Sequence, residues 1–163
     1  MDLITVAQVL GNLGEFLGAI AVVATLGYLA VQIRGNTRAT QADSRYAVGQ
    51  TTLDLCLALS NDREFASIWR RGLDDRDSLD ADEHFRWGYH AYAVWDSYEI
   101  NFIQWQRGVL TDGDWAKWQT VIRNYLSKPG MQQYWQESKR AFHPEFQQLV
   151  DALEPQAIGI SGW

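Results

Sequence analysis

Residues 16–33 read FLGAIAVVATLGYLAVQI and contain no charged side chain, although the chain of 163 residues carries 14 Lys and Arg and 20 Asp and Glu. A helix of this length spans about 27 Å, which is close to the roughly 30 Å hydrocarbon core of a bilayer. The stretch therefore predicts a single transmembrane helix over residues 13–33. The alternative is the buried core helix of a soluble bundle.

The residues on either side of this stretch predict its orientation. The first 33 residues contain no Lys or Arg, so the basic region of a secretory signal peptide is missing. Arg34, Arg38 and Arg45 follow the stretch, whereas Asp2 and Glu15 precede it. By the positive-inside rule, the N-terminus lies outside and residues 34–163 lie in the cytoplasm.

The start of the spanning helix is predicted from a capping pattern. The apolar residues 3–10, LITVAQVL, are followed by Gly11 and Asn12. Asn12 and Glu15 have the spacing of a capping box, in which each side chain accepts a hydrogen bond from the other residue's backbone amide. We therefore expect the helix to begin near Leu13, with residues 1–12 forming a short interfacial segment.

Small and polar residues recur along one face of the span at a 4-3-4-3-4 spacing. In lipid, small residues let two helices approach closely, and polar side chains add hydrogen bonds between them. The spacing favours a helix-packing interface over a lone span with scattered small residues. Its members are Gly14, Gly18, Ala21, Thr25, Tyr28 and Gln32.

The rest of the chain predicts an all-α fold, with a bundle of about five helices after the span. Residues 34–154 form the cytoplasmic helical domain and residues 155–163 a tail. Residues 34–61 allow the first helix to continue, and further helices are expected over residues 63–73, 81–107, 112–126, 130–142 and 144–154. Asp62, Asp80 and Thr111 are expected N-caps, and Gly108 is a C-cap candidate.

Residues 81–107 form the longest aromatic element, with rings recurring every three or four residues. This spacing predicts a helix with a wide buried face. The aromatic residues are Phe85, Tyr89, Tyr92, Trp95, Tyr98, Phe102 and Trp105.

The composition excludes several functions. The net charge is −6 and the pI about 4.9, which argues against nucleic acid as a partner because phosphate binding requires a basic patch. The motifs of zinc, di-iron, nucleotide and serine-hydrolase sites are missing, so we expect no cofactor and no metal.

Residues 74–83 fail the calcium-loop pattern and are read as a solvated loop. The single cysteine, Cys56, is expected to be a buried, inert thiol.

One group of polar residues on the aromatic helix deserves a second interpretation. Tyr92, Asp96 and Glu99 are spaced by four and three residues and therefore share a face. Inside a bundle, the two carboxyl groups could serve acid–base chemistry or line a pocket for a small molecule or lipid. The alternative is a structural role, with hydrogen bonds to aromatic donors or ion pairs with arginines.

Two parts of the sequence carry a resemblance to known proteins. One is NLGEFLGAIAVVATLGYLAVQIRGNTRA at residues 12–39. The other is an aromatic helix followed by GVLTDGDWAKWQ at residues 108–119 and LSKPGMQQYWQESKRAFHPEFQQLVD at residues 126–151. Together they resemble a broad family of uncharacterised bacterial proteins with one N-terminal transmembrane helix and a helical cytoplasmic domain. The resemblance implies a bacterial inner membrane location but no reaction. This chain departs from the family in having Gly35 directly after the span, which weakens a continuous helix there.

The sequence thus predicts a membrane-anchored, non-enzymatic accessory or scaffold subunit. Its partners would be membrane lipid and either another copy of itself or a larger inner-membrane complex. The alternative is an enzyme or a ligand-binding helical domain with its site near Tyr92, Asp96 and Glu99.

Overall fold

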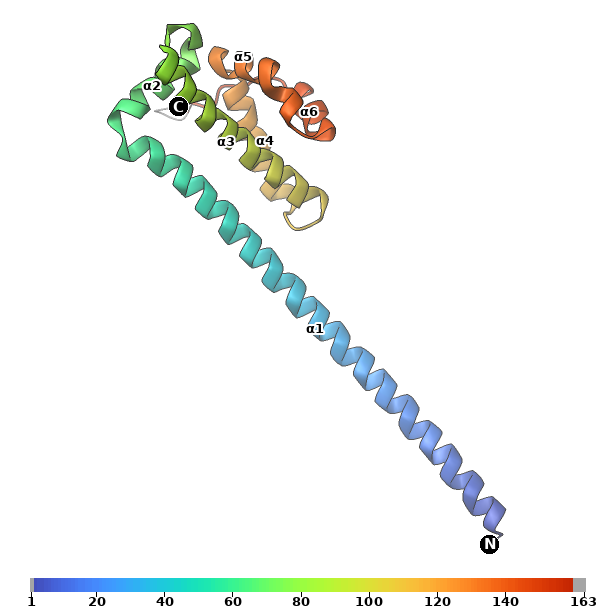
Figure 1. The fold of residues 1–163 in the computed structure, drawn as a ribbon. Coiled ribbons are helices and arrows are strands. Elements are labelled where there is room, and N and C mark those ends of the chain that lie inside the picture. The colour runs from blue at the N-terminus through green and yellow to red at the C-terminus, as the bar shows by residue number, and fades with distance from the viewer. Residues whose placement is uncertain (1, 160–163) are drawn as a thin grey trace. The chain divides into compact units, whose positions relative to one another are not determined.

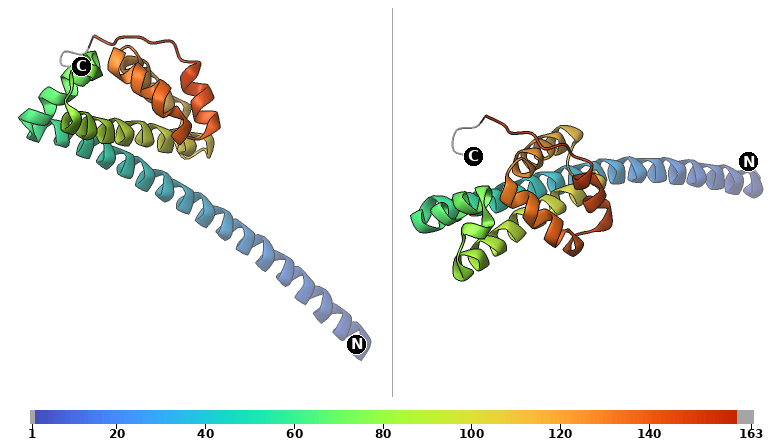
Figure 2. Two further views of the ribbon diagram at one scale, coloured as in Figure 1. Left: turned by 45° about the horizontal axis from the view of Figure 1, so that its top comes forward. Right: turned by 90° about the horizontal axis from the view of Figure 1, so that it is seen from above.

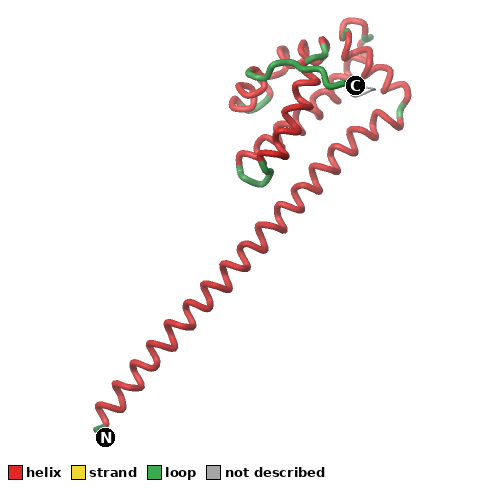
Figure 3. The backbone as a smooth tube through the Cα atoms, turned by 180° about the vertical axis from the view of Figure 1, so that it is seen from behind, coloured by secondary structure: helices red, strands yellow, loops and turns green. Residues whose placement is uncertain are grey.

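The structure is a computed structural model that describes residues 2–159, and these residues are helical without a strand (Figures 1 and 3). The elements are α1 (Leu3–Asn61), α2 (Arg63–Asp74), the 3-10 turn η1 (Arg76–Ser78), α3 (Ala81–Gln106), α4 (Asp112–Leu126), α5 (Pro129–Ser138), the 3-10 turn η2 (Lys139–Ala141) and α6 (Pro144–Asp151). The predicted all-α class is confirmed, with five α-helices after α1. The chain divides into two compact units, Met1–Ala42 and Asp43–Trp163.

Helix α1 begins at Leu3, so the predicted start near Leu13 is wrong. Gly11 costs a helix about 1 kcal/mol relative to alanine, but breaking the helix there would cost several backbone hydrogen bonds and a new nucleation step. Asn12 and Glu15 therefore lie inside the helix rather than at its first turn. The helix also continues through Gly35.

The N-terminal caps of three later helices form as their sequences predict. The Asp62 carboxylate accepts a hydrogen bond from the Phe65 amide at 2.9 Å and starts α2. Asp80 begins α3 and Thr111 begins α4, each with a complete capping box. Gly108 has a φ of 71°, which only glycine adopts without strain, and it follows the end of α3.

Helix α3 carries the central part of the bundle core, and α5 and α6 lie together on one side of it (Figures 1 and 2). Trp95 is fully buried, and its ring packs against that of Trp135 in α5, with 4.5 Å between the centroids and a tilt of 35°. Its indole N–H is directed at the Met131 sulfur at 3.1 Å. Trp87 is also fully buried and donates to the backbone carbonyl of Trp69 in α2 at 3.2 Å. Paired aromatic rings therefore tie α2 and α5 to α3.

The predicted buried face of α3 is wrong in its first half. Phe85 is 64% exposed, Tyr89 67% and Tyr92 44%. Two successive three-residue steps, from Tyr92 to Trp95 to Tyr98, rotate the stripe by about 120° around the helix, since each step falls 60° short of a turn. The buried residues of α3 are Trp87, Ala91, Val94, Trp95, Tyr98, Asn101 and Phe102.

The acidic loop before α3 is not simply solvated, because Arg76 is only 4% exposed. Its guanidinium lies 5.3 Å from the Trp87 ring and 5.4 Å from the Tyr134 ring. It also donates to the Glu137 carboxylate at 2.9 Å. This hydrogen bond outweighs the effect of burial and lowers the pKa of Glu137. The arginine therefore fastens the loop to α3 and α5.

Cys56 differs from its prediction as well, since its thiol is exposed. Leu55 and Leu59 of the same helix pack against the bundle core instead. The predicted apolar face of this segment was too wide, because it included Cys56, which lies next to Leu55 in the sequence but is exposed.

The end of the chain is tied to α4. The Gln156 amide donates to the Arg123 carbonyl at 3.0 Å, and the Ile158 amide donates to the Asn124 side chain at 3.0 Å. The predicted tail over residues 155–163 is thus held along its first part (Figure 2). Its residues 160–163 lie outside the described residues.

The crossing of α2 and α5 predicts the effect of a single methyl group. A Cβ atom at Gly130 would lie 1.8 Å from the Gly72 carbonyl oxygen, so Gly130→Ala forces two helix backbones apart. We expect a loss of about 3 kcal/mol in the free energy of unfolding. The matched control is Gly88→Ala, because a Cβ there meets nothing within 4 Å. That change should stabilise α3 by about 0.5–1 kcal/mol. Unfolding of the full-length protein by urea, followed by tryptophan fluorescence, measures both, and equal effects would contradict the packing described.

His90 predicts a pH dependence of stability. The centroid of the His90 ring lies 5.1 Å from that of Phe65 and 4.7 Å from that of Trp69, and both contacts are T-shaped. Burial lowers the pKa of His90 from 6.5 to about 4. Between these values the unfolded chain binds the additional proton, so stability falls as the pH drops from about 6.5 to about 4. His90→Phe keeps a ring and removes the proton site. The difference in Tm between about pH 7.5 and about pH 5 should therefore shrink in the variant, and an unchanged difference would contradict this assignment.

Candidate functional site

The described residues contain one helix segment that is long and apolar enough to cross a membrane, and it lies in α1. None of the residues in its apolar window is buried within the chain. Its large side chains are between 43% and 69% exposed. These side chains are Phe16, Leu17, Ile20, Val22, Val23, Leu26, Leu29, Val31 and Ile33.

The six residues of the predicted packing interface also lie exposed on this helix. A Cβ atom at Gly14 or Gly18 would meet nothing within 4 Å, and Tyr28 is 68% exposed. The Thr25 hydroxyl donates to the Ala21 carbonyl at 2.8 Å, so its hydrogen-bonding need is met inside the helix. Gln32 is exposed as well. Within the described chain, the stripe has space for a closely approaching second helix.

Tyr92, Asp96 and Glu99 lie on one side of α3, as their spacing predicts. They line neither the groove beside α5 and α6 nor the small cavity between residues 47–52 and α3. Tyr92 is partly exposed and stacks on Phe142 at 5.8 Å. The Glu99 carboxylate accepts a hydrogen bond from the backbone amide of His143, the residue that precedes α6. Asp96 is half-buried. The observed contacts of Tyr92 and Glu99 hold the α6 region against α3.

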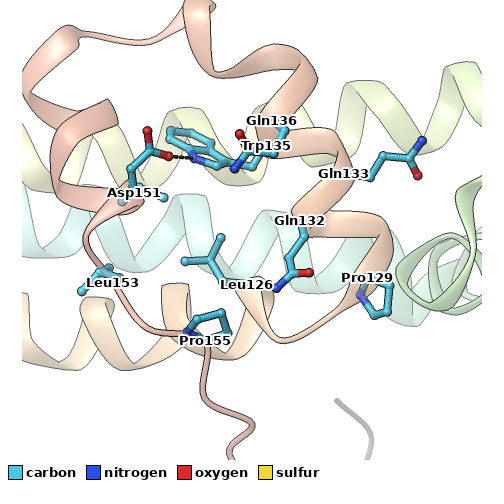
Figure 4. A pocket seen from close by; sticks show the side chains of 10 residues that line it. Leu126, Pro129, Gln132, Gln133, Trp135, Gln136, Asp151, Leu153 and Pro155 are labelled. Carbon is cyan, nitrogen blue, oxygen red and sulfur yellow. Dashed lines mark hydrogen bonds between the residues drawn. The ribbon is translucent and has the colours of Figure 1, made fainter.

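The larger cavity is an open groove of about 550 Å³ between α5, the end of α6 and the segment that follows (Figure 4). Its volume lies in the range of ligand pockets. The sequence analysis did not predict this groove. Its one local signal is the spacing of Gln132 and Gln136, which lie one helical turn apart and both line the groove. The lining residues are Leu126, Pro129, Gln132, Gln133, Trp135, Gln136, Val150, Asp151, Leu153 and Pro155.

The one charged side chain of the groove is already engaged. The Asp151 carboxylate accepts from the Trp135 indole at 2.8 Å (Figure 4) and from Lys139 at 2.8 Å. Partial burial acts to raise the pKa of Asp151, but the hydrogen bonds from Lys139 and Trp135 outweigh it, so the pKa lies below its ordinary value. An anion stabilised in this way is a weak proton acceptor. The groove thus offers amides and apolar surface rather than reactive groups.

Two tyrosines of the bundle core are perturbed by burial. Burial raises the pKa of Tyr98 and of Tyr125, so both phenols stay protonated at neutral pH. In the part of the chain that the structure describes, no group of three His, Cys, Asp or Glu side chains could hold a metal ion. The strongest functional feature is therefore the bare apolar face of α1.

Comparison of this chain with known protein families, with curated proteins and with solved structures finds no match.

Proposed function

We propose that this protein is a membrane-anchored accessory or scaffold subunit, in which residues 16–33 cross a membrane and the helical domain acts by binding rather than by catalysis. The observation that supports this proposal is the absence of any buried residue in the apolar window of α1. A core helix of a soluble bundle would bury that window against its own chain. Lipid provides the missing apolar surroundings.

The charges around the span support one orientation. All Lys and Arg residues lie from Arg34 onward, and positive residues next to a span stay on the cytoplasmic side. Residues 34–163 are therefore proposed to lie in the cytoplasm, with the N-terminus outside. An inner membrane is proposed because the sequence resembles bacterial proteins with one N-terminal span.

Association with a protein partner is supported by the exposed stripe of α1. Helices in lipid gain little from hydrophobicity alone and associate through close packing at small residues. Gly14 and Gly18 offer such a surface with open space around them. The bundle adds no reactive constellation among residues 2–159, which favours a binding role for it.

The stripe predicts the mass of the detergent-extracted particle. The protein should stay in the membrane fraction after an alkaline carbonate wash. After extraction with detergent, it should form a particle whose protein mass exceeds that of one chain. Gly18→Leu and Ala21→Leu place bulk on the stripe and should reduce that mass. Val23→Leu, on the other side of the helix, is the control and should not. Light scattering on the purified particle measures this, and a monomer for the natural chain would contradict the proposed association.

Cys56 provides a test of orientation, because it is exposed and is the only cysteine. A maleimide that cannot cross membranes should label it in inverted vesicles and not in intact spheroplasts. The Cys56→Ser chain gives the background, and Ala81→Cys in that background gives a second exposed position. Labelling of either cysteine from the outside would overturn the proposed orientation.

A further inference from the structure

We propose that α1 pairs in parallel with α1 of a second copy of this chain, along a face that continues from the span to the end of the helix. This inference rests on the proposed membrane anchoring and names the partner that the stripe binds. It concerns residues 35–60 as well as the span.

The spacing of the stripe does not end with Gln32. The same alternation of three and four residues continues to the last turn of α1 without meeting a charged residue. The further positions are Gly35, Ala39, Ala42, Tyr46, Gly49, Leu53, Cys56 and Ser60, and all eight are exposed. Charges occur beside the stripe instead, for example at Asp43 and Asp54. A segment that is otherwise polar thus keeps one uncharged face.

In residues 43–61, the helix has two apolar faces. The first packs on the bundle through Leu55 and Leu59. The second contains Tyr46, which is 70% exposed, and Leu53, which is 48% exposed. At about 100° per residue, Tyr46 and Leu53 lie about 150° around the helix from Leu55 and Leu59. The bundle therefore explains the first face, whereas Tyr46 and Leu53 of the second face lie exposed.

The period of the stripe favours another helix as its cover. A 3.5-residue repeat drifts by about 20° per heptad on a straight helix of 3.6 residues per turn. Over the interval from Gly14 to Ser60 the drift exceeds 120°, so the stripe stays on one face only if the helix winds around a partner. Lipid or a flat protein surface gives no reason for this repeat to be maintained.

A second copy fits this face better than an unrelated helix. Two copies anchored in one membrane run parallel, so each position meets its own equivalent across a two-fold axis. Glycine or alanine then faces itself at Gly35, Ala42 and Gly49, where the helices can approach closely. In this frame the sequence also has an arginine at position 38 and an aspartate at position 43, which are the g and e positions that meet between parallel helices.

The pairing places Cys56 of the two copies opposite each other. A disulfide requires Cβ atoms within about 4.5 Å, which only residues facing each other across the axis can approach. Crosslinking therefore reports which face of α1 is shared.

The test uses the full-length chain in native membranes, oxidised in air with copper(II) phenanthroline. Two thiols that join release two protons and two electrons, and two Cu(II) ions pass these electrons to oxygen. The natural Cys56 is compared with single cysteines in a Cys56→Ser background. Gly49→Cys and Ser60→Cys lie on the stripe, whereas Asp54→Cys and Ala58→Cys are exposed residues off the stripe. Dimer yield is read on a non-reducing gel.

We expect the three stripe cysteines to give at least several-fold more covalent dimer than the two others. Equal yields at all five positions, or no dimer from Cys56, Gly49→Cys and Ser60→Cys, would overturn the pairing. The outcome is separable from that of the proposed function. A membrane-bound particle heavier than one chain without stripe crosslinks would keep the scaffold and replace the second copy by another protein. Recovery of the chain in the soluble fraction would reject the anchoring itself.

Discussion

Apolar side chains that find no cover within their own chain are the constraint on which this structure depends. The nine large side chains of residues 16–33 are roughly half exposed. At about 1.5–3 kcal/mol for full burial of each, leaving them in water costs on the order of 10 kcal/mol. That is comparable with the whole stability of an ordinary domain. An external apolar environment, such as the lipid proposed above, would recover this free energy.

The helical bundle, by contrast, covers its own apolar surface. Trp87, Trp95 and Trp135 are buried, and their indole N–H groups reach a carbonyl, a sulfur and a carboxylate within the bundle. Arg76 finds two rings and a carboxylate. Polar groups that are satisfied in this way stabilise the fold. Among the described residues, the least covered apolar surface belongs to α1.

The helix boundaries of the bundle could be predicted because caps are local. Asp62, Asp80 and Thr111 each act within three residues of their own position. Burial could not be predicted as well, because it depends on which neighbour covers a residue. Phe85 and Tyr89 follow a helical spacing and are still exposed, and Arg76 is charged and still buried. The groove at Asp151 is lined by residues of α5, α6 and the segment after α6. No single stretch of sequence could therefore predict it.

Residues 43–61 combine both situations in one helix. Leu55 and Leu59 pack into a core made by later parts of the chain, while Tyr46 and Leu53 lie exposed on another face. A helix that serves only to attach a bundle to its anchor needs one apolar face, and the outer residues of such a helix are normally polar. An uncharged second face that keeps the 3.5-residue spacing of the small residues in the span has no role in that attachment. Its role is intelligible if α1 joins two surfaces, one belonging to its own bundle and one belonging to a partner helix.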